Sequence, residues 1–116
     1  MSPLPELTAA LDRLWLRFLP EMRQRIALLE AAAHACAVST LSTAQTAEAH
    51  TVAHKLAGSL GTFNLPRGTV LARQLEMLYV PQNIPGPERT PELAAIAVEL
   101  RTLIESRTPD TKAESE

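Results

Sequence analysis

The sequence predicts an all-α fold, an antiparallel four-helix bundle with an additional N-terminal helix. Its apolar residues are mostly alanine and leucine, which are the strongest helix formers, and only 3% of the chain is aromatic. In several segments the apolar residues recur at three- and four-residue steps, which is the spacing of one buried helix face. Short turns separate these segments, and short connections favour antiparallel neighbours in a bundle.

Two helices are expected before residue 38. Ser2 and Pro3 form a cap and first turn, and a stripe of apolar residues follows at Leu4, Leu7, Leu11, Leu14, Trp15 and Phe18. Pro20 should end this helix, because its ring clashes with the preceding turn, and it can open the next one. The buried face of that second helix is marked by Met22, Ile26, Leu29, Ala33 and Cys36. The hydroxyl-rich segment 39–43 is then a turn.

Three further helices are marked by their start and stop signals. Ser42 followed by Gln45 has the form of a capping box, so the third helix starts near Thr43 and runs to Phe63. Asn64 suits a helix end, since it tolerates the left-handed conformation. The remaining signals are a restart at Pro66, inward residues at Leu71, Leu75 and Leu78, a proline-rich loop over 80–87, and a last helix from Thr90 to Ile104. Residues 1–105 form one domain, and 106–116 are expected to be a frayed polar tail.

The charge and composition exclude several classes of protein. A net charge of −2 argues against a broad electrostatic grip on nucleic acid or on an anionic membrane. No apolar run reaches the roughly 20 residues that span a bilayer. Charged residues interrupt the N-terminal apolar positions, which is not the pattern of a signal peptide. Cys36 is the single cysteine, so no disulfide forms within the chain. We expect a cytoplasmic monomer.

The most informative residue is His54, in the third expected helix. Projected at about 100° per residue, it lies roughly 150° from the middle of the apolar stripe and should face solvent. Two glycines lie on the same face, although glycine in a helix costs about 0.5–1 kcal/mol relative to alanine. They leave room for a partner to approach the histidine. The neighbours expected on this face are His50, Ala57, Gly58 and Gly61.

An exposed imidazole is a competent nucleophile near neutral pH. It can accept a phosphoryl group on one ring nitrogen while the other holds a proton, and that proton needs an acceptor to fix the tautomer. If the third and fourth helices form a hairpin turning near Leu65, position 54 lies opposite Glu76. Glu76 is therefore the candidate acceptor for the His54 ring.

The run His54-Lys55-Leu56-Ala57-Gly58-Ser59-Leu60-Gly61-Thr62-Phe63 resembles the signature of histidine-containing phosphotransfer domains, and Leu71 to Glu76 resembles the helix that follows it. The Gly-Thr-Phe run is similar to the phosphotransfer domains of chemotaxis histidine kinases. The resemblance implies that His54 accepts the phosphoryl group through Nε2 and that Glu76 binds Nδ1. It implies a phosphoryl carrier rather than an enzyme. Its partners would be response-regulator receiver domains and a hybrid histidine kinase, and the receiver would supply Mg²⁺, so the chain needs no cofactor of its own.

The sequence departs from this pattern at two positions. Ala57 stands where the family usually has a lysine that helps to hold the phosphoryl group, and Asn64 stands where it often has glycine. In the hairpin register, position 57 lies opposite Arg73, which points away from the leucine face. We hypothesise that Arg73 supplies the missing charge. Lys55 is the rival, although it projects roughly 100° around the helix from His54.

Three alternatives remain open from the sequence. The chain can be a helical module of the same fold that binds receiver domains without efficient phosphotransfer, for which Ala57 is the best argument. His54 can be an ordinary surface histidine. His50 and His54 are four residues apart, a spacing that suits a metal, but no third ligand is evident and we expect none to be bound. An autonomous enzyme is not expected, because no nucleotide loop, metal set or catalytic dyad is present.

Overall fold

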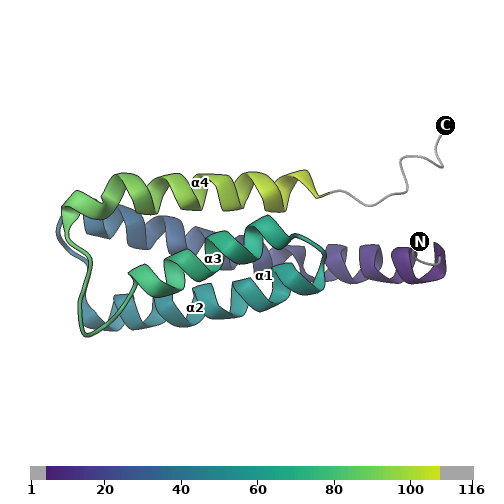
Figure 1. The fold of residues 1–116 in the computed structure, drawn as a ribbon, viewed down its shortest axis with the longest axis horizontal. Coiled ribbons are helices and arrows are strands. Elements are labelled where there is room, and N and C mark those ends of the chain that lie inside the picture. Colours follow the sequence, from purple (N-terminus) through teal and green to yellow (C-terminus); the bar gives the residue numbers. More distant parts are fainter. Residues whose placement is uncertain (1–4, 108–116) are drawn as a thin grey trace.

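The computed structural model describes residues 5–107, which form four α-helices. In Figure 1 these helices run up and down along one axis. No strand is formed within this part of the chain, and an isolated bridge joins Val80 to Asn83. The prediction of an all-α four-helix bundle is confirmed. A short 3-10 turn, η1, covers Pro87–Arg89 and leads into the last helix. The helices are α1 (Pro5–Ala37), α2 (Thr43–Thr62), α3 (Pro66–Leu78) and α4 (Thr90–Ser106).

The additional N-terminal helix is not separate, which corrects the expectation at Pro20. α1 is 33 residues long and continues through this proline without a break. Its N-terminal part extends beyond the other helices in Figure 1. A proline in a helix interior removes one hydrogen bond to the carbonyl four residues earlier. Pro20 and Leu16 are both exposed, so water can satisfy the carbonyl that loses its partner. The buried residues Trp15 and Met22 hold the helix on either side of the proline.

The helix boundaries follow local signals in the sequence. The Ser42 hydroxyl accepts a hydrogen bond from the Gln45 amide at 3.0 Å, and the Gln45 side chain accepts one from the Ser42 amide at 2.9 Å. This is the expected capping box at the start of α2. Asn64 takes a left-handed conformation, with φ of 63°, directly after Phe63, the residue that caps the end of α2. Pro66 then begins α3, where a missing amide hydrogen costs nothing.

The core is one continuous cluster to which all four helices contribute. α1 packs on α2 and α4, while α3 packs on α2 and α4. No helix between residues 5 and 107 has the length and apolar character needed to cross a membrane. The largest fully buried side chains are Trp15, Tyr79, Met22, Ile26, Leu29, Leu56, Leu60, Leu71, Leu75, Leu93, Leu100 and Ile104.

Arg107 fixes the C-terminal end of α4 to the rest of the bundle. Its Nε donates to the Phe63 carbonyl at 3.1 Å and its Nη1 lies 3.3 Å from the Asp12 carboxylate. The guanidinium stands 5.1 Å above the Trp15 ring, and the Trp15 indole donates to the Arg107 carbonyl. The predicted start of the tail, at residue 106, is therefore too early, because Ser106 belongs to α4 and Arg107 makes these contacts. Residues 108–116 lie outside the described part of the chain.

Candidate functional site

His54 stands on the outer face of α2, and its side chain is 71% exposed. Its neighbours Ala53 and Leu56 are fully buried, so the helix turns its apolar side inward and the imidazole outward, as the projection predicts. The ring is thus accessible to a partner protein without any rearrangement of the bundle.

The carboxylate of Glu76 binds the inner nitrogen of this ring. Glu76 Oε2 lies 2.8 Å from His54 Nδ1, and the Glu76 side chain is 22% exposed. A carboxylate only accepts hydrogen bonds, so Nδ1 carries the proton. In the neutral imidazole Nε2 then keeps its lone pair. The contact with Glu76 therefore fixes the tautomer of the neutral ring, in which Nε2 is unprotonated.

The hairpin of α2 and α3 sets this contact, and the two helices lie side by side in Figure 1. Position 54 meets position 76, as expected for a turn near Leu65. Closer to that turn, the Thr69 hydroxyl donates to the Ala57 carbonyl at 2.9 Å. Gly68 allows a close approach, since a Cβ built there would lie 2.7 Å from Leu60 Cδ1. The sequence analysis did not single out Thr69 or Gly68.

The two glycines near His54 have different surroundings. A Cβ added at Gly58 would have no heavy atom within 4 Å, so Gly58 leaves open space one turn after the histidine. A Cβ at Gly61 would lie 3.3 Å from Thr69 Oγ1. Gly61 is exposed but borders α3, so its small size serves helix packing as well as access. Of the two, Gly58 leaves the open space beside His54.

Ala57 is not on the exposed face that the helix projection assigned to it, because its side chain is only 3% exposed. It lies about 60° around α2 from His54, on the side that α3 covers. Thr69 and Glu76 of α3 contact α2 on this side. The neighbouring helix therefore buries a position that a projection of α2 alone leaves open.

Two exposed cations, Lys55 on α2 and Arg73 on α3, are the candidates for a positive charge near His54. Lys55 and Arg73 are exposed, and neither makes a hydrogen bond or ion pair with any residue of the described chain. On α3, Arg73 lies one turn from Thr69 and one turn from Glu76, the two residues that contact α2 at positions 57 and 54. Arg73 is therefore placed along the stretch of α2 that starts at His54. Lys55 projects to the flank away from α3.

His50 is less exposed than the sequence suggested, with 42% of its side chain accessible. Its Nδ1 lies 2.8 Å from the main-chain oxygen of Glu76 and 3.0 Å from that of Tyr79. No sequence signal marks a contact of this kind, because main-chain acceptors are present at every residue.

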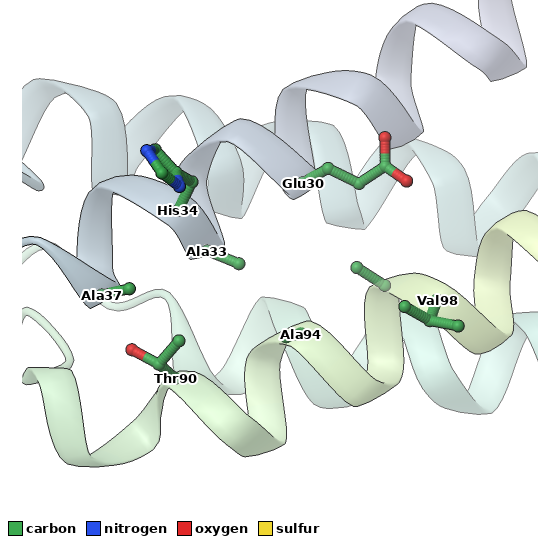
Figure 2. A pocket seen from close by; sticks show the side chains of 8 residues that line it. Glu30, Ala33, His34, Ala37, Thr90, Ala94 and Val98 are labelled. Atoms are coloured by element: carbon green, nitrogen blue, oxygen red, sulfur yellow. The ribbon is translucent and has the colours of Figure 1, made fainter.

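The site is a surface rather than a pocket. Within residues 5–107 no group of three metal-binding side chains is close enough to hold an ion. A cavity of about 360 Å³ opens between α1 and α4, with Ala33 and Ala37 of α1 on one side and Thr90 and Val98 of α4 on the other in Figure 2. It contains none of the residues around His54. Its lining consists of Glu30, Ala33, His34, Ala37, Thr90, Ala94, Ala97 and Val98.

Comparison with known proteins agrees with this geometry. The family model of the Hpt domain matches residues 13–109. Protein RcaC of Microchaete diplosiphon is 30% identical over 100 residues, which are 86% of this chain and 15% of that protein. The chain thus spans a small part of the length of this relative. No solved structure matches the chain significantly.

Proposed function

The chain belongs to the Hpt domain family, and on that premise we propose that His54 accepts a phosphoryl group from the aspartyl phosphate of one receiver domain and passes it to the aspartate of another. The family supports a histidine phosphotransfer role in a phosphorelay, as a phosphoryl carrier and not as a classical enzyme. The observation that carries the proposal is the hydrogen bond from the exposed His54 ring to Glu76. A hybrid histidine kinase is the proposed source of the phosphoryl group.

The transfer step follows from the tautomer of His54. Its unprotonated Nε2 attacks the phosphorus, the N–P bond forms, and the bond from phosphorus to the aspartate oxygen breaks, so the aspartate leaves as a carboxylate. The proton stays on Nδ1, and the ring gains positive charge that the Glu76 carboxylate, 2.8 Å away, stabilises. Transfer to the second receiver reverses these bond changes. The chain supplies no cofactor in this scheme, and Mg²⁺ enters with the receiver.

We further propose that Arg73 contacts the phosphoryl oxygens. Arg73 is exposed and has no hydrogen-bond or ion-pair partner in the described chain, and on α3 it lies between Thr69 and Glu76, the two residues that contact α2. A guanidinium binds two phosphate oxygens through a rigid planar fork of N–H groups, whereas an ammonium acts as a point charge without that geometry.

The Arg73 proposal predicts slower phosphorylation in an Arg73→Ala variant, with partial recovery in Arg73→Lys, which keeps a positive charge at the same exposed position. Arg67→Ala is the matched control, because Arg67 lies on the α4 side of α3 and binds Glu99 at 2.8 Å. Equal transfer by the parent and Arg73→Ala would reject the role of Arg73 and leave Lys55 as the available cation.

The main test uses a receiver domain phosphorylated with radioactive phosphate. We expect label on this chain that is lost in acid and kept in base, as for phosphohistidine, and no label on a folded His54→Gln variant. His34→Gln is the control, since His34 is an exposed histidine on α1. Binding of the receiver without any transfer would support the alternative, a helical interaction module. Label on His34 or His50 would contradict the assignment of His54.

A further inference from the structure

His50 has no part in the scheme above, yet it touches the residue that binds the phosphoryl acceptor. It lies one turn before His54 on α2 and borders the end of α3. Three of its contacts involve Glu76 or the residue that follows α3, and together they indicate which ring nitrogen carries the proton in the neutral form.

The first contacts fix the tautomer of His50. A main-chain carbonyl can only accept a hydrogen bond, so Nδ1 of His50 must donate to the Glu76 and Tyr79 oxygens at 2.8 and 3.0 Å. α3 ends at Leu78, and the last carbonyls of a helix have no partner within it. His50 therefore closes the C-terminal turn of α3, the turn from which the Glu76 side chain projects.

The other nitrogen of His50 faces the carboxylate of Glu76. His50 Nε2 is 4.0 Å from Glu76 Oε2, the same oxygen that lies 2.8 Å from His54 Nδ1. Because Nδ1 of His50 holds the proton in the neutral ring, Nε2 has only a lone pair and cannot donate to this oxygen. His54 is then the imidazole that donates to Oε2. A hydrogen on His50 Nε2 would compete for it.

We propose that His50 is a positioning residue for phosphoryl transfer. It holds the end of α3 through two main-chain oxygens and presents an unprotonated nitrogen to Glu76, so that the carboxylate stays on His54 Nδ1. Through Glu76 it keeps His54 in the tautomer with a free Nε2. The proposal rests on the proposed function for its effect on transfer, but not for its effect on the His54 ring.

Two amide substitutions test the roles of the two ring nitrogens of His50 one at a time. In His50→Asn the amide nitrogen reaches the place of Nδ1, so it can donate to the carbonyls while nothing replaces Nε2. In His50→Gln the amide nitrogen reaches the place of Nε2, where it can donate to Glu76 Oε2 and compete with His54. His50→Ala removes both groups and serves as the second variant should His50→Gln fail to fold.

The measurements are the ¹⁵N chemical shifts of the His54 ring, which report its tautomer, and the initial rate of phosphoryl transfer from a phosphorylated receiver. Urea unfolding confirms that each variant is folded under the assay conditions. We expect His50→Asn to keep the parental tautomer and rate. His50→Gln and His50→Ala should lose part of the Nδ1-protonated population of His54 and transfer about tenfold more slowly, as when an orienting partner is removed.

Parental His54 shifts and transfer rates in His50→Gln and His50→Ala would overturn the proposal. An equal loss of rate in all three variants with an unchanged His54 tautomer would also overturn it, since that result indicates a purely structural role. If the parent protein takes up no phosphate, the proposed function fails. The His54 shifts in the three variants still decide the role of His50 in that case.

Discussion

Replacing glycine with alanine at three positions should change stability in three different ways, although each change adds the same methyl group. Gly58 and Gly61 lie in α2, and Gly68 lies in α3. Within a helix, alanine is favoured over glycine by about 1 kcal/mol when its methyl group has space. A Cβ at Gly58 has no heavy atom within 4 Å, so Gly58→Ala should gain about 0.5–1 kcal/mol.

The other two positions offset this gain to different degrees. At Gly61 the new Cβ would lie 3.3 Å from Thr69 Oγ1, whose hydroxyl is already bound to the Ala57 carbonyl. Thr69 must shift slightly, so the gain should be smaller than at Gly58. At Gly68 the Cβ would lie 2.7 Å from a methyl group of the fully buried Leu60. Overpacking a core costs about 1–3 kcal/mol, which exceeds the gain, so Gly68→Ala should destabilise the bundle.

Urea denaturation followed by circular dichroism measures all three changes in the free energy of unfolding. For a domain of this size, 1 kcal/mol shifts Tm by about 4–8 °C, so a thermal scan also resolves the expected order. In parallel, Gly58→Leu should slow phosphoryl transfer while the bundle stays folded, because the side chain rises beside His54. A Gly58→Ala variant less stable than Gly68→Ala would refute the steric reasoning, and parental transfer by Gly58→Leu would refute the role of the open space.

Three other substitutions test separate parts of the structure. Glu76→Gln removes the charge beside His54 and should slow phosphoryl uptake about tenfold, which the receiver assay measures; an unchanged rate would count against the carboxylate. Arg107→Ala removes a largely buried partner of Asp12 and should lower the free energy of unfolding by about 3 kcal/mol, whereas a loss below about 1 kcal/mol would place this ion pair with ordinary surface pairs. The hydroxyl of Tyr79 is buried without a hydrogen-bond partner among residues 5–107, and burial raises the pKa of this phenol. Because the folded state favours the neutral phenol, stability should fall as pH rises above about 10, the pKa of an unfolded tyrosine. Urea unfolding at pH 7 and at pH 10.5 measures this loss of stability, and Tyr79→Phe should abolish it. A variant whose free energy of unfolding changes with pH as in the parent would contradict the prediction.

Local signals predicted the helix boundaries well where a nearby side chain decides them. The Ser42 capping box and the restart at Pro66 depend on residues within one turn, so the sequence contains the whole interaction. Pro20 shows the limit of such signals. Its cost is fixed by chemistry, but the outcome depends on solvent exposure and on the packing of Trp15 and Met22. The free energy gained by packing along the whole of α1 exceeds the cost of one proline inside the helix.

The candidate site was predictable where it follows one helix and less so where two helices meet. The outward position of His54 and its contact with Glu76 follow from periodicity and from the length of the hairpin. The prediction that Ala57 is exposed was wrong, because a projection of α2 does not show which side of the helix α3 covers. The contacts of His50 and Arg107 with main-chain oxygens were missed altogether, since no side-chain pattern marks a carbonyl acceptor.

The placement of His54 on an open helix face has a kinetic consequence. A protein that docks over this ring covers about 800 Å² of surface, so two receivers cannot reach the same nitrogen at once. If His54 carries the phosphoryl group between two receivers as proposed, donor and acceptor must bind in turn, and the chain must dissociate from the first before it binds the second. Such an exchange obeys ping-pong kinetics, in which a high concentration of unphosphorylated acceptor competes with the donor and inhibits its own phosphorylation. The rate at which phosphoryl groups pass from donor to acceptor would then depend on the relative abundance of the two receivers.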